Sequence, residues 1–181
     1  MKRIAITTAF ALLGSVALAQ TASERLGVNS ALGIAPTTQD FVSEAARSGQ
    51  FEIQSSELAK TKASDPGTKS FADEMIADHR KADAALKDLV KSKNINVTIP
   101  TDLSSSQQSD LDQLKRLSGA DFDRQYRDDQ YNGHKEAVSL FQRYAKGGDN
   151  PDLKKWAEQT APTLEHHLQM ARDLDNKQGS K

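Results

Sequence analysis

Three histidines and one glutamate lie on apolar helix faces in this sequence: Glu52, His79, His134 and His167. At about 100° per residue, each projects onto or beside the apolar stripe of a long helical segment. Each also lies near the middle of its segment. A residue at the middle of its helix stays at the middle of a bundle whichever way the helix runs, so we predict that the four side chains meet in one buried layer.

Burying imidazole and carboxylate groups is costly unless they are paired or bind a metal. Three imidazoles and one carboxylate form a ligand set that suits Zn²⁺, Cu²⁺, Mn²⁺ or Fe²⁺. A metal-free polar core is the alternative, in which Glu52 accepts hydrogen bonds from histidines while water or Tyr126 satisfies the rest. Both interpretations stay open at this point, and Glu52, His79, His134 and His167 are the candidate metal ligands.

Four further residues could support this layer. Asp78 precedes His79 at the edge of the apolar stripe and could hydrogen-bond a ligand, although a solvated helix acid is the simpler interpretation. Asp123 and Tyr126 lie one turn apart and could hydrogen-bond across the bundle. Met75 lies one turn before His79, where a thioether would favour copper, but methionine at this spacing more often packs in the core.

The sequence does not favour an enzyme. Di-iron carboxylate proteins place a glutamate three residues before a histidine on two of their helices. The residues three before the candidate histidines are Ile76, Tyr131 and Leu164, none of them acidic. No nucleophile elbow, phosphate-binding loop or cysteine-based motif is present, and the chain has no cysteine. The fourth histidine, His166, points away from the apolar face and provides an outward-facing control.

The elements that must position these residues are helices separated by proline and glycine. Their composition is rich in Ala, Leu, Lys and Gln and poor in β-branched residues, which is typical of helix. Helices are predicted over about 38–62, 66–93, 120–146 and 151–176, with a short accessory helix over 106–117. Thr37, Asp65 and Asn150 are the predicted N-caps, and Pro162 should bend the last helix.

Four apolar stripes of similar length predict an all-α fold, a four-helix bundle with an accessory helix between its second and third helices. The long connection after the second helix could carry the chain across the bundle, as in ferritin-like folds. It could equally return the chain to a neighbouring position.

The N-terminus has the pattern of a secretory signal peptide over residues 1–19. Lys2 and Arg3 precede an apolar stretch that ends in Ala17-Leu18-Ala19, a typical cleavage site. We therefore divide the chain into this signal peptide, a flexible arm over 20–36, the bundle over 37–176 and a tail over 177–181. The expected location is the periplasm or the exterior, after cleavage near Ala19.

The net charge of the chain limits the kinds of molecule that it is expected to bind. The chain carries 24 Lys and Arg against 25 Asp and Glu, and removal of Lys2 and Arg3 makes the balance 22 to 25, or −3. A weakly acidic protein is not expected to bind nucleic acid or anionic lipid. After cleavage, no apolar run is long enough to span a membrane.

The region from about Asp40 to Leu174 resembles the bacterial, usually exported domain-of-unknown-function family four-one-four-two. The resemblance rests on Asp40-Phe41-Val42, Met75-Ile76-Ala77-Asp78-His79, Leu117-Ser118-Gly119 and Pro162-Thr163-Leu164 among other segments. It implies a ferritin-like fold, and Glu52, His79, His134 and His167 match the family's characteristic polar positions. The family has no agreed activity, so the resemblance implies no reaction.

Two hypotheses follow. The first is an exported bundle that sequesters or senses a divalent transition metal, with a role in envelope stress. The second is a structural or partner-binding helical module whose polar core binds no metal and only fixes the register of the helices.

Overall fold

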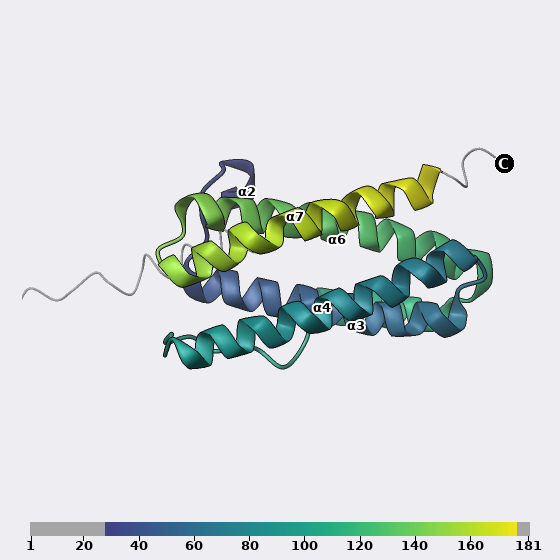
Figure 1. Cartoon of the computed structure of the whole chain (residues 1–181). Coiled ribbons are helices and arrows are strands. Elements are labelled where there is room, and N and C mark those ends of the chain that lie inside the picture. The colour runs from purple at the N-terminus through teal and green to yellow at the C-terminus, as the bar shows by residue number, and fades with distance from the viewer. Residues whose placement is uncertain (1–27, 177–181) are drawn as a thin grey trace, which may run out of the picture.

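The computed structural model describes residues 28–176, which form helices and their connections with no strand among them. The helices are α2 (Val28–Ala31), α3 (Thr38–Lys62), α4 (Pro66–Ser92), α5 (Ser105–Arg116), α6 (Gly119–Gly147) and α7 (Pro151–Asn176) (Figure 1). The all-α fold is therefore confirmed, and the four long helices and the accessory helix agree with their predicted bounds to within about one residue. Helix α7 continues through Pro162, so the proline does not end the helix.

Local side-chain chemistry sets where three of the four long helices, α3, α4 and α7, begin. The Thr37 hydroxyl accepts a hydrogen bond from the Asp40 amide, and Asp65 Oδ2 accepts one from the Thr68 amide at 2.8 Å. Asn150 Oδ1 accepts one from the Leu153 amide at 3.0 Å. Each cap satisfies an amide that the first turn of a helix leaves without a partner.

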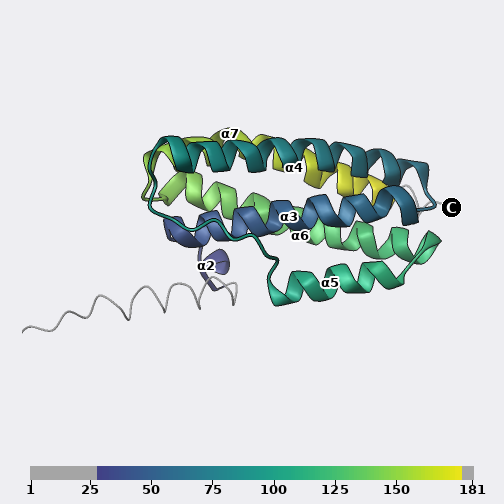
Figure 2. The same ribbon diagram turned by 90° about the horizontal axis from the view of Figure 1, so that it is seen from below.

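The direction of each helix shows whether the long connection after the second helix carries the chain across the bundle. Helices α3 and α4 form one antiparallel pair, α6 and α7 form another, and α3 packs on α6 while α4 packs on α7. The segment 93–104 and α5 run back along the outside of the bundle (Figure 2). As a result α4 and α6 start at the same end, where Asp123 near the start of α6 contacts Ser64 just before α4. This is the crossing connection of ferritin-like folds.

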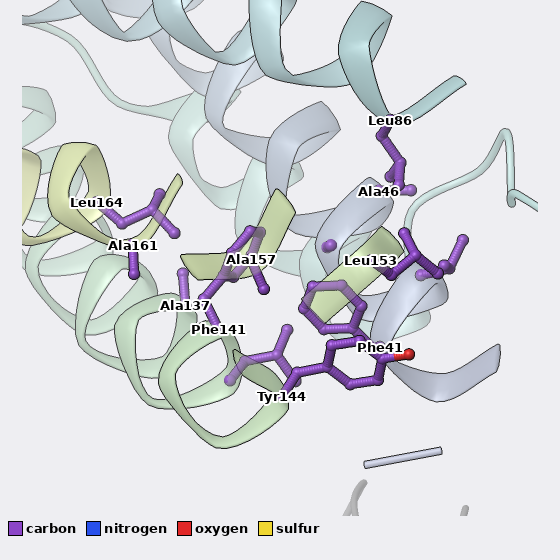
Figure 3. Close-up of a cluster of buried hydrophobic side chains, with 13 residues drawn as sticks. Phe41, Ala46, Leu86, Ala137, Phe141, Tyr144, Leu153, Ala157, Ala161 and Leu164 are labelled. Atoms are coloured by element: carbon purple, nitrogen blue, oxygen red, sulfur yellow. The ribbon is translucent and has the colours of Figure 1, made fainter. Parts of the chain in front are cut away.

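The core consists of two apolar clusters at opposite ends of the bundle. One contains Phe41 and Tyr144, whose rings stack with centroids 3.9 Å apart, together with Leu86, Leu153 and Leu164 (Figure 3). The other lies around Phe71, Met75, Phe122 and Tyr126. Along α4, α6 and α7, the candidate histidine falls between the members of these two clusters, so the layer of histidines separates them. On α3, Glu52 directly follows Phe51, a member of the second cluster.

The segment that precedes α3 is partly described. From residue 28 to residue 36 the chain forms α2 and contacts α6, where Ser30 Oγ lies 3.0 Å from Ser139 Oγ and the Ile34 carbonyl accepts from Arg143. The predicted flexible arm over 20–36 thus includes a short helix that rests on the bundle. The predicted signal peptide and the predicted tail over 177–181 lie outside the described residues. Among the described helices, none has the length and hydropathy needed to cross a membrane.

Candidate metal centre

Three imidazoles from three helices meet in the layer between the two apolar clusters. His79 on α4, His134 on α6 and His167 on α7 are 6%, 1% and 1% exposed. Their ring centroids are 5.3 to 5.6 Å apart. One nitrogen of each ring lies within 4.8 Å of one nitrogen of each other ring. The matched depths of the histidines along their helices therefore correspond to a real convergence.

His134 is held in one orientation by its own helix. Its Nδ1 lies 2.8 Å from the Gln130 carbonyl oxygen, one turn earlier on α6. A carbonyl can only accept, so Nδ1 carries the proton and Nε2 of the neutral ring carries a lone pair. Burial lowers the pKa of His134 to about 4, against an opposing effect of the Gln130 carbonyl. At neutral pH this ring therefore presents an unprotonated Nε2 to the layer.

His167 is oriented by a carboxylate. Its Nε2 lies 3.0 Å from Asp78 Oδ2, so Nε2–H donates and Nδ1 carries the lone pair. Nδ1 is buried and has no hydrogen-bond partner among the described residues. Burial lowers the pKa of His167 although Asp78 opposes the shift. A histidine whose far nitrogen donates to a carboxylate is the usual arrangement of a metal-ligating imidazole.

His79 is the third imidazole of the layer. Its Nε2 lies 3.4 Å from Nε2 of His134. Because the His134 nitrogen is the acceptor, Nε2–H of His79 donates in the metal-free protein. Burial lowers the pKa of His79 well below its usual value, and the nearby His134 and His167 rings lower it further. This ring is therefore also neutral.

Glu52 is fully buried on α3 but lies to one side of the three imidazoles. Its Oε1 is 4.0 Å from Nδ1 of His134, the nitrogen that faces the Gln130 carbonyl. Burial raises the Glu52 pKa to about 8, although the Gln130 side chain lowers it. Oε2 has no hydrogen-bond partner among the described residues. The three histidines form a group of potential ligands within mutual reach, and Glu52 is not part of it.

The residues predicted from the sequence to support the layer lie in different places in the structure. Asp78 contacts His167, as described. Asp123 accepts from the Ser64 and Asp65 amides at 3.1 Å, which places it at the start of α4, and 11 residues of helix, roughly 16 Å, separate it from His134. The predicted hydrogen bond across the bundle is therefore present, but the Asp123 carboxylate holds the turn between α3 and α4 and lies away from the histidine layer.

Tyr126 and Met75 belong to the apolar cluster next to the layer. The Tyr126 hydroxyl bonds to Ser56 Oγ at 2.7 Å, so the predicted hydrogen bond across the bundle is present between α6 and α3. Met75 is fully buried within the same cluster, which agrees with a packing role. His166 faces outward and its side chain is 66% exposed.

Sequence reasoning missed Gln130. Its side chain is fully buried, its Nε2 donates to Ser55 Oγ at 3.3 Å, and its carbonyl orients His134. The signal was present, because Gln130 lies four residues after Tyr126 and four before His134 on the same helix face.

The separation of the imidazole nitrogens fits a metal better than it fits a hydrogen bond. A good N–H···N contact is near 3 Å, and the His79–His134 separation of 3.4 Å is at the outer limit. Zinc–nitrogen bonds of about 2.0–2.1 Å in a tetrahedral site place two ligand nitrogens about 3.3–3.4 Å apart. Together with the unpartnered Nδ1 of His167, this shows that the residues present fit a transition metal.

Comparison with known proteins agrees with an all-helical fold. Residues 23–174 match the family model described as domain of unknown function DUF4142, so the chain belongs to this family. Among solved structures, CopM in the Cu(II)-bound form has the same fold, with a TM-score of 0.64 and 21% sequence identity over 79% of this chain and 99% of that chain. No curated protein matches the sequence.

Proposed function

We propose that this protein binds one divalent transition metal ion between His79, His134 and His167, with copper(II) as its first choice. The observation that carries the proposal is the fixed orientation of two of the rings. The Gln130 carbonyl and the Asp78 carboxylate hold one nitrogen of His134 and of His167, which leaves the other nitrogen of each unprotonated in a buried layer.

The ligand chemistry supports copper or zinc over harder metals. Imidazole nitrogens suit copper and zinc, whereas manganese prefers sites rich in oxygen. At a site of fixed ligands, divalent copper binds more tightly than the other first-row ions. CopM, whose fold is similar, was solved with Cu(II) bound. This similarity supports copper as the first ion to test, and zinc is the competing ion.

The surrounding residues have distinct roles in this proposal. Asp78 and the Gln130 carbonyl fix which nitrogen of each ring faces the layer. His79 has no such constraint and must move its proton from Nε2 to Nδ1 to become a ligand. Glu52 lies near the His134 Nδ1, where its ionised form would offset part of the positive charge of a bound ion.

The proposed role is metal sequestration or sensing after export. The signal-peptide pattern of residues 1–19 supports a periplasmic location, and the intact mass of the protein from a periplasmic fraction tests cleavage after Ala19. Nothing in the layer places an acid, a base or a nucleophile around an open substrate pocket, so binding is proposed rather than catalysis.

The direct test is calorimetric titration of the metal-free protein with Cu²⁺ and Zn²⁺, combined with melting temperatures. One ion per chain and a higher melting temperature are expected. His79→Ala should weaken binding at least tenfold, whereas the outward-facing His166→Ala should leave affinity unchanged. Circular dichroism would show that both variants fold. If neither ion binds the native protein, the metal-free polar core is correct.

A further inference from the structure

A second group of potential ligands lies at the surface between α4 and α7. Oxygen atoms of Glu74 and Asp78 and one nitrogen of His167 lie within 4.8 Å of one another. The Glu74 and Asp78 side chains are 42% and 39% exposed, whereas His167 is 1% exposed. His167 belongs to this group and to the three-histidine layer, so its ring connects the surface to the interior.

Glu74 is a carboxylate on the surface of α4 that forms an ion pair with a histidine. It makes no hydrogen bond among the described residues, and the basic group near it is His166, whose Nε2 is 3.9 Å from Glu74 Oε1. It lies four residues before Asp78, so both carboxylates project from the same face of α4. Two carboxylates next to an imidazole attract a hydrated divalent cation from solvent.

The buried layer needs such a route. All three imidazoles of the layer are at most 6% exposed, and apolar clusters lie on both sides of it. The cavity beside His79 is only about 30 Å³ and is lined mainly by residues such as Ala45, Leu86 and Phe141. A hydrated dication loses too much hydration free energy to cross apolar surface of this kind.

We propose that Glu74, Asp78 and Nε2 of His167 form a loading site that captures a divalent metal ion and passes it to the three-histidine layer. The inference rests on the proposed metal-binding function and adds how the ion reaches its site. Capture uses Nε2 of His167, with the ring proton on Nδ1. In the buried centre Nδ1 is the ligand and the proton is on Nε2, where it donates to Asp78.

Transfer is therefore an exchange of ligands coupled to a change of tautomer. The metal–oxygen bonds to Glu74 and Asp78 break as metal–nitrogen bonds to His79 and His134 form. The ring proton of His167 moves from Nδ1 to Nε2, so no net proton is gained or lost by that ring. Because a neutral imidazole offers one lone pair at a time, the two sites share one ion, and saturation remains at one ion per chain.

Stopped-flow mixing of the metal-free protein with Cu²⁺ tests the proposal. The single tryptophan, Trp156, lines the cavity next to His79, so quenching of its fluorescence reports the arrival of copper. Glu74→Gln should slow loading at least fivefold at low ionic strength and leave the final copper content at one per chain. Glu136→Gln, which removes an exposed carboxylate from α6, is the matched control and should load at the native rate.

The outcomes separate the two proposals. Slow loading with full final occupancy in Glu74→Gln supports the loading site, and added salt should narrow the difference because it screens the carboxylate. Loading at the native rate overturns the loading site and leaves the three-histidine centre intact. Reduced final occupancy also overturns it, because Glu74 would then belong to the final site. If the native protein takes up no copper, both proposals fail.

Discussion

Asp78 on α4 and His167 on α7 are joined by a contact of 3.0 Å between Oδ2 and Nε2. The pair links a half-exposed carboxylate to an imidazole that is 1% exposed. It connects two helices and determines which nitrogen of His167 is unprotonated. An ordinary surface ion pair contributes little to stability, so its importance lies in what it does to the imidazole.

Replacing Asp78 with Asn should weaken metal binding tenfold to about a hundredfold, because His167 then lacks the carboxylate that fixes its tautomer. Competition with a chelator of known affinity measures the change. Asp88→Asn, which neutralises an exposed carboxylate on the same helix, should bind metal like the native protein. Equal affinity of both variants would show that Asp78 does not orient His167.

Metal binding should persist to lower pH than a typical histidine site allows. A proton and a metal ion compete for the same lone pair of the imidazole, and a lower pKa means that the proton binds more weakly. The pKa of His134 is lowered to about 4, and those of His79 and His167 are also lowered by burial. The usual histidine value of about 6.5 would predict loss of metal near that pH. We instead expect bound metal to be retained at pH 5.5 and lost toward pH 4, as measured by equilibrium dialysis.

Glu52 makes the metal-free protein less stable at alkaline pH. Its folded pKa of about 8 lies above the value of 4.5 for an unperturbed side chain, so the folded state holds a proton that the unfolded state releases. This contribution to stability is complete below pH 4.5 and is lost as pH rises through 8. Glu52→Gln should therefore raise the free energy of unfolding by roughly 2–4 kcal/mol at pH 8.

The same substitution should have little effect near pH 4.5, where Glu52 is protonated in the folded state. Denaturant unfolding at both pH values gives the comparison, and Glu136→Gln again serves as the exposed control. A Glu52→Gln variant with the same stability difference at both pH values would mean that Glu52 is not protonated in the folded protein.

Two glycines near the centre should respond differently to alanine. A Cβ at Gly133 would lie 3.0 Å from Glu52 Oε1, whereas a Cβ at Gly49 would lie 4.0 Å from His79 Nδ1, an ordinary contact. Gly49→Ala should gain about 0.5–1 kcal/mol from helix propensity. Gly133→Ala should lose about 1–3 kcal/mol through crowding of the buried carboxylate. Thermal unfolding of the metal-free variants tests the pair, and equal stabilisation of both would contradict the crowding at Glu52.

The sequence predicts the helices and the depth of the histidines because both depend on local signals. Caps at Asp65 and Asn150 set where α4 and α7 begin, and the spacing of His79 and His167 from those starts sets their level in the bundle. The crossing connection could not be predicted, because breakers define where a helix ends but not where the chain goes next. It is recognised in the structure from the Asp123–Ser64 contact.

The different positions of Glu52 and of the histidine ring nitrogens within the layer also could not be predicted from the sequence. Depth places Glu52 level with the histidines, but an error of a fraction of a turn decides whether its carboxylate faces their Nε2 or their Nδ1 atoms. The structure puts it on the Nδ1 side of His134. The partners of Nδ1 and Nε2 depend on the neighbouring helix and on a backbone carbonyl, and residue type alone cannot reveal either of them.

X-ray absorption spectroscopy of the copper-loaded and zinc-loaded protein tests the central claim most directly, because it identifies the atoms bonded to the metal. We expect three imidazole nitrogens, at about 2.0–2.1 Å for zinc, and the loss of one imidazole in His134→Ala but not in His166→Ala. A ligand shell of oxygen atoms without imidazole scattering, or a shell that His134→Ala leaves unchanged, would contradict the three-histidine centre.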